Sequence, residues 1–115
     1  ITKFDLRNRK LESKEASQRE FSQAFFYQML KLNNYITELN LWYNEIGDEG
    51  AKSLGEVLKH NDTLTIVNFG QNLIGDEGAK ALGKSLKYNN SLTKLNLSMN
   101  RIGHEGGKTL GESLQ

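Results

Sequence analysis

A segment of 28 residues recurs along this chain of 115 residues, and the recurrence limits the possible folds more than any other feature. Copies begin at Ile36, Leu64 and Leu92. The first two copies agree at 15 of 28 positions and the third agrees with the second at 13 of its 24, against about two expected by chance. Self-similarity at this period is typical of repeat proteins in which each unit packs only against its neighbours.

Each copy has two halves with different periodicity. In the first half, apolar Leu39 and Leu41 alternate with polar positions, which predicts a half-buried strand. In the second half, Ala51, Leu54 and Leu58 follow helical spacing. A strand followed by a helix in every repeat makes successive strands parallel neighbours. The small rotation per unit is expected to curve the stack, with the sheet on the inside.

The pattern L-x-x-L-x-L-x-x-N-x-I-G-x-E-G runs from Leu92 to Gly106 and recurs in the earlier copies. It resembles the ribonuclease-inhibitor-like class of leucine-rich repeats, the class found in NOD-like receptors. The pattern and the resemblance predict one α/β domain, a leucine-rich-repeat solenoid with a parallel sheet on the concave side, helices on the convex side and about four strand–helix units. The predicted units are a divergent long first repeat at 1–35, regular repeats at 36–63 and 64–91, and a truncated repeat at 92–115.

Composition narrows the classes of function. The net charge of +1 gives no one-signed field to attract nucleic acid or an anionic membrane, and no stretch approaches the roughly 20 apolar residues that span a bilayer. The absence of cysteine excludes disulfides and cysteine-ligated metals and fits a reducing compartment, which favours a cytoplasmic location. His60 and His104 lack partners at a spacing that would suit a metal or acid–base catalysis. We therefore expect no metal, no cofactor and no enzymatic activity.

Several recurring polar and small residues are expected to be scaffold. Asn44, Asn72 and Asn100 stand at the strand-to-helix turn, where a buried amide can bond the loops of its own and the adjoining repeat. The GDEG segments are predicted to begin helices, because acidic residues there complement the helix dipole. Two sets of glycines recur as well: one at the turn, where a positive φ is easiest for glycine, and one in helix interiors, where it favours close helix packing. The first set is Gly47, Gly75 and Gly103, and the second is Gly55, Gly83 and Gly111.

The strand positions that point away from the core leucines are the candidate binding surface. Equivalent side chains of adjacent repeats should stand side by side, about 4.8 Å apart. The third position gives the row Lys3, Glu38, Ile66 and Lys94, the fifth gives Asp5, Asn40, Asn68 and Asn96, the seventh gives Arg7, Trp42, Gly70 and Ser98, and the eighth gives Asn8, Tyr43, Gln71 and Met99. From these rows the predicted protein-binding residues are Arg7, Glu38, Asn40, Trp42, Tyr43, Ile66, Asn68, Gln71, Lys94, Asn96 and Met99.

Trp42 is the most informative member of these rows. An exposed Trp with a neighbouring Tyr and Arg matches the composition of interface hot spots, which favours binding. The alternative is that the indole lies flat over Gly70 and Arg7 and simply covers the sheet. For the asparagine row at the fifth position, two interpretations stay open: a strip that bonds the backbone of a partner, or a ladder that is satisfied by itself.

The expected partner is another protein, without nucleic acid, membrane or cofactor. The resemblance implies functions such as nuclease inhibition, innate-immune sensing or action as an effector of intracellular bacteria, in which last case the location would be the host cytosol. An alternative is a regulator of an enzyme, either an inhibitor or a GTPase-activating protein that acts through Arg101 or Asn100. The last repeat carries no altered cap sequence, so we expect either a fragment of a longer array or a homodimer formed through the uncapped ends.

Overall fold

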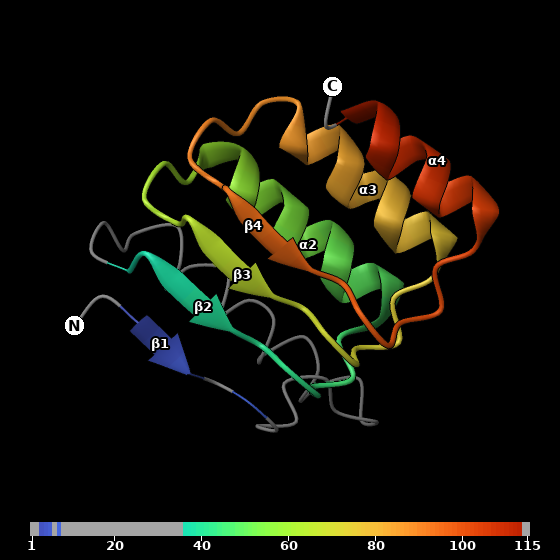
Figure 1. Cartoon of the computed structure of the whole chain (residues 1–115), viewed down its shortest axis with the longest axis horizontal. Coiled ribbons are helices and arrows are strands. Elements are labelled where there is room, and N and C mark those ends of the chain that lie inside the picture. The colour runs from blue at the N-terminus through green and yellow to red at the C-terminus, as the bar shows by residue number, and fades with distance from the viewer. Residues whose placement is uncertain (1–2, 6, 8–35, 114–115) are drawn as a thin grey trace.

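The computed structural model describes residues 3–5, 7 and 36–113, and in this part of the chain strands and helices alternate (Figure 1). Three consecutive strand–helix units follow a first strand. The elements are β1 (Lys3–Asp5), β2 (Glu38–Asn40), α2 (Gly47–His60), β3 (Ile66–Asn68), α3 (Asp76–Leu86), β4 (Lys94–Asn96) and α4 (His104–Ser113). The predicted long first repeat, 1–35, otherwise lies outside the described residues.

The four strands form one parallel sheet in the order β1-β2-β3-β4, and helices α2, α3 and α4 lie together on one side of it (Figure 1). The register pairs equivalent residues of neighbouring repeats, which confirms the predicted rows at the third and fifth positions. The paired rows are Lys3, Glu38, Ile66 and Lys94, and Asp5, Asn40, Asn68 and Asn96. The backbone ladder continues beyond the strands, since the N–H of Tyr43 donates to the carbonyl of Gly70 over 3.1 Å.

The core lies between the sheet and the helices. Strand residues of one parity, such as Leu39 and Val67, are at most 2% exposed, and they meet Leu58 and Leu82 from the helices, which are equally buried. The two predicted periodicities therefore converge on one apolar layer. Full burial of an aliphatic side chain of this size contributes about 2 kcal/mol, so the layer supplies most of the stabilisation of the stack.

A ladder of asparagine side chains joins successive repeats at the strand-to-helix turn. The Nδ2 of Asn72 donates to the carbonyl of Leu41 in the preceding repeat over 2.7 Å and to that of Phe69 in its own repeat over 3.0 Å. Its Oδ1 accepts from the backbone N–H groups of Asn44 over 2.8 Å and Ile46 over 3.3 Å. Because Asn72 is fully buried, no water can replace these bonds. The scaffold role predicted for these asparagines is confirmed.

The aspartates of the GDEG segments act across repeats as well. The Oδ1 of Asp48 accepts from the N–H of Gly75 over 2.7 Å and that of Gly78 over 2.9 Å, both at the start of α3. Asp76 makes the equivalent bonds to the start of α4. The segments do begin helices, as predicted, but each aspartate caps the helix of the next repeat. The same position in the last repeat is His104, which has no carboxylate.

The glycine predictions are partly confirmed. Gly47 has φ +70°, but Gly75 is extended, with φ −102° and ψ −161°, and Gly103 has no positive φ either, so the prediction of a positive φ at that turn was wrong for Gly75 and Gly103. The extended backbone directs the N–H of Gly75 to Asp48 instead. In the helix interior, a Cβ on Gly55 would lie 2.7 Å from Ser85 Oγ, which confirms close packing of α2 against α3. Gly111 has no atom near its Cβ position, because no helix is described beyond α4.

Asn72→Ala is expected to lower the free energy of unfolding by at least about 3 kcal/mol, because it leaves the buried N–H groups of Asn44 and Ile46 without an acceptor and removes one donor each from the carbonyls of Leu41 and Phe69. Chemical denaturation of the purified chain measures this loss. The matched control is Asn96→Ala, at an exposed position of the same residue type, for which we expect a loss of about 0.5 kcal/mol. Equal losses in the two variants would contradict a structural role for the ladder.

Candidate functional site

The face of the sheet opposite the helices, hereafter the sheet face, carries the predicted binding residues, and Trp42 lies across it. The indole is half-buried and occupies the space above Gly70, where a Cβ would collide with its six-membered ring. Trp42 therefore lies outside the leucine core, as its parity predicts. Of the alternatives for the indole, the structure shows that it covers Gly70. Its remaining exposed surface stays available to a partner.

Within the chain, the asparagine row forms hydrogen bonds through its amide oxygens only. The Oδ1 atoms of Asn40, Asn68 and Asn96 accept from the backbone N–H two residues later, over 3.0, 2.8 and 2.9 Å. The Nδ2 atoms of these three asparagines donate to no group in the described part of the chain. The row is thus not a ladder that is satisfied by itself. It turns each strand end with its oxygens and leaves a line of amide donors on the sheet face.

The charged residues of the sheet face are paired at one end and unpaired at the other. Glu38 forms a salt bridge of 3.2 Å with Lys3. Arg7 binds Asp5 over 2.9 Å, so its guanidinium is directed to its own strand. Lys94 is exposed and has no carboxylate partner in the described part of the chain. The net positive charge on this face therefore lies toward β4.

A hollow of about 280 Å³ lies on the sheet face over β1, β2 and β3. It brings together four of the predicted binding residues, Glu38, Asn40, Ile66 and Asn68, beside Lys3, Asp5 and Leu39. The other predicted residues lie outside it: Arg7, Trp42, Tyr43, Gln71, Lys94, Asn96 and Met99. The hollow combines apolar surface with amide donors and two ion-paired carboxylates, those of Asp5 and Glu38, which suits a mixed polar and apolar side chain of a partner.

Left-handed backbone places the side chains of the eighth row at the rim of the sheet face. Tyr43, Gln71 and Met99 have φ values of 58°, 54° and 57°. Tyr43 is 47% exposed and Met99 is 67% exposed. Since this conformation costs a non-glycine residue about 1 kcal/mol, its recurrence at one position shows that the turn geometry is imposed by the repeat. No glycine, asparagine or other turn signal marks these positions in the sequence.

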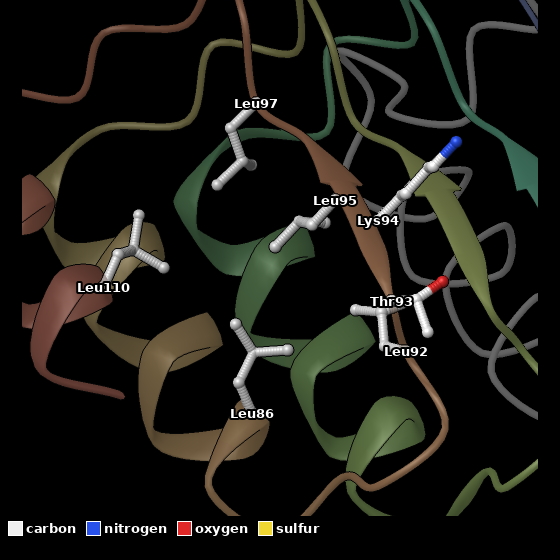
Figure 2. Close-up of a pocket in the computed structure, with 7 residues that line it drawn as sticks. All are labelled: Leu86, Leu92, Thr93, Lys94, Leu95, Leu97 and Leu110. Atoms are coloured by element: carbon white, nitrogen blue, oxygen red, sulfur yellow. The ribbon is translucent and has the colours of Figure 1, made fainter. Parts of the chain in front are cut away.

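A second apolar surface lies at the β4–α4 end (Figure 2). Leu95 and Leu97 project from β4 and its continuation toward Leu110 of α4 and Leu86 of α3, while Lys94 extends away from them (Figure 2). These leucines are only partly buried, whereas the equivalent Leu39 is 2% exposed. They line a cavity of about 450 Å³. In the earlier repeats, the equivalent leucines are covered by the repeat that follows. At the β4–α4 end these leucines are therefore left open.

Among residues 3–5, 7 and 36–113, no three His, Asp or Glu side chains are grouped so that they could hold a metal ion. None of the helices in the same part of the chain is both long and apolar enough to cross a bilayer.

Comparison with known proteins agrees with this geometry. The family model described as "Leucine Rich repeat" matches residues 32–55, 60–83 and 88–111, more than half of the chain. No curated protein matches the sequence. Among solved structures 52 chains match, and one of them, "Leiomodin-1 Actin-Binding Site 2 (ABS2)", aligns with a TM-score of 0.79 at 23% sequence identity. The alignment covers 98% of this chain and 63% of that one, and it shows a shared fold.

Gly70→Ala is expected to displace the indole of Trp42, because the new methyl group occupies the space of the ring. Trp42 is the only tryptophan, so the emission maximum of intrinsic fluorescence should move to longer wavelength as the ring enters water. The free energy of unfolding should fall by about 1 kcal/mol, because apolar contact is lost.

The matched control for this variant is Gly107→Ala in α4, whose Cβ would meet no atom within 4 Å. It should leave the fluorescence unchanged and stabilise the chain slightly, because alanine favours the helix by up to about 1 kcal/mol. An unchanged emission maximum in Gly70→Ala would contradict the contact between Trp42 and Gly70.

Proposed function

Because this chain belongs to the leucine-rich repeat family, we propose that it is a protein-interaction module that binds its partner through the sheet face. The observation that carries the proposal is the half-exposed indole of Trp42, which lies on Gly70 just beyond the ends of β2 and β3. Tryptophan and tyrosine contribute much of the binding energy at protein interfaces, since they bury a large area with few rotatable bonds.

The surroundings of Trp42 support this proposal. Tyr43 is exposed beside it, and the asparagine row offers amide donors at successive strands. An interface needs an apolar centre with hydrogen-bonding groups around it, and both are present here. We propose further that the chain is of the ribonuclease-inhibitor-like class, with about four units that curve so that the sheet face is concave. A concave face can surround a convex partner and so bury more area per residue.

An enzyme regulator remains the second candidate. Of the two rim residues predicted for a GTPase-activating role, Asn100 is engaged in the ladder, where its Oδ1 accepts from the N–H groups of Asn72 and Ile74 over 2.9 Å each. Arg101 is exposed. A regulator of this kind would therefore act through Arg101. Measuring GTP hydrolysis by a bound GTPase with and without the chain separates stimulation from simple binding.

The proposed role is binding without catalysis, and a cytoplasmic location stays a prediction from composition. We also propose that two copies of the chain pair through the β4–α4 end. The support is the open leucine cavity of about 450 Å³ together with the outer edge of β4, the last strand of the sheet. Two such edges related by a two-fold axis can pair as antiparallel strands and bury both leucine sets.

Trp42→Ala is expected to weaken binding to the partner by at least about 2 kcal/mol, because it removes a central aromatic contact. The partner is first captured with the wild-type chain, and its affinity is then measured by calorimetry. Actin, after which the similar leiomodin site is named, provides a defined first partner to test. The control variant is Lys108→Ala, at an exposed position of α4. If Trp42→Ala binds the partner as tightly as the wild-type chain does, the proposal that the sheet face is the binding surface is wrong.

Light scattering at high protein concentration should show twice the mass of one chain, 13.0 kDa. Leu95→Glu places a charge in the leucine cavity of the β4–α4 end, so it should shift the dimer to monomer while circular dichroism retains the helix signal. A wild-type chain that stays monomeric at high concentration rules out pairing through this end.

A further inference from the structure

A groove of about 490 Å³ lies between α2 and α3. It is lined entirely by side chains of these two helices and of the two residues after α3, so it is separate from the sheet face. The lining residues are Lys52, Glu56, Lys59, Ala81, Lys84, Ser85, Lys87 and Tyr88. None of them belongs to the binding surface proposed above.

The walls of the groove follow helical spacing. Lys52, Glu56 and Lys59 stand at positions i, i+4 and i+7 of α2 and therefore share one face of the helix. Small residues form the floor on the α3 side. The Oγ of Ser85 lies in the space that a side chain at Gly55 would occupy. The groove is thus a channel about two helical turns long, or roughly 10 Å, with long flexible side chains along its rims.

The groove concentrates positive charge. It is lined by four lysines and one glutamate, a formal charge of +3, whereas the whole chain carries +1. The carboxylate of Glu56 forms an ion pair with the Nζ of Lys59 over 3.7 Å. Lys84 and Lys87 have no carboxylate partner among the described residues.

Two of the four lysines are paired along α2. Lys52 contacts Glu49 over 3.2 Å and Lys59 contacts Glu56 over 3.7 Å, and both are i,i+3 pairs of the kind that stabilises a helix. The unpaired positive charge of the groove therefore lies at Lys84, in the last turn of α3, and at Lys87 directly after that helix.

The groove also exposes an aromatic ring. Tyr88 is 67% exposed, and the Nζ of Lys59 lies 5.5 Å from the centroid of its ring. A tyrosine that projects from the end of a charged groove provides apolar contact area beside the lysines. The site thus combines cations, an aromatic ring and a floor of small residues.

We propose that this groove binds an acidic helix of a partner protein. A helix with glutamate or aspartate at every third or fourth position matches the spacing of the lysines on the two rims, and its apolar side can rest on Ala81 and Tyr88. Nucleic acid fits less well, because its affinity depends on many phosphate contacts and the charged region is only about two helical turns long. The acidic helix would occupy the helical side of the chain while the sheet face stays free.

The test uses a fluorescent synthetic peptide of about three helical turns, with glutamates every third or fourth residue. Fluorescence anisotropy measures its binding to the full chain. Lys84→Glu/Lys87→Glu should weaken binding at least about tenfold, because two attractions become repulsions. Lys108→Glu, a charge reversal on α4 outside the groove, should leave the affinity unchanged. Trp42→Ala should also bind normally, which separates this site from the sheet face.

Further measurements decide the class of ligand. The analogue of the peptide with lysine in place of glutamate should not bind, and added salt should weaken the glutamate peptide, because exposed charge pairs are screened. Chemical-shift changes in ¹⁵N spectra should centre on Ala81, Ser85 and Tyr88. The proposal is overturned if the double variant binds as wild type, if the glutamate peptide does not bind at all, or if an oligothymidylate or a phosphatidylserine vesicle binds more tightly than the peptide. Melting curves of each variant confirm that it is folded.

Discussion

The side-chain amide of Asn72 is the constraint on which the rest of the structure depends. It donates to carbonyls of two repeats and accepts from two N–H groups of the preceding one, while it is fully buried. A shift of one repeat against the next by a single residue would break the three bonds that Asn72 makes to the preceding repeat, inside the core, where each lost partner costs about 2 kcal/mol. The register of the sheet, and with it every row on the sheet face, follows from this ladder.

A second set of hydrogen bonds connects each helix to the next. Asp48 and Asp76 each cap the helix that follows in the next repeat. His104 stands at this position in the last repeat and has no carboxylate for a further helix start. Together with the partly buried leucines around Leu95, this makes the β4–α4 end chemically different from the junctions between the repeats.

The strand residues that face the helices and the residues of the turns stabilise the fold. The strand residues that face the other way are therefore free to differ between repeats. Leu39 and Val67 are buried against the helices, whereas their neighbours Glu38 and Ile66 face outward. The helices show the same division, with Leu54 buried on one side and Lys52 exposed on the other. Two opposite surfaces can therefore carry separate partners on one scaffold, since most of the side chains on each surface lie outside the core.

The sequence alone determined the strand–helix order, the rows one repeat apart and the burial of the asparagine ladder, because these depend on periodicity, which is a property of the chain. The tertiary structure decided what depends on contacts between repeats. It showed that the indole of Trp42 covers Gly70, that Asp48 caps the helix of its neighbour, and that the turn at Tyr43 is left-handed. It also formed the basic groove between α2 and α3. Periodicity shows which side chains share a face, but only packing fixes the distance and direction between them.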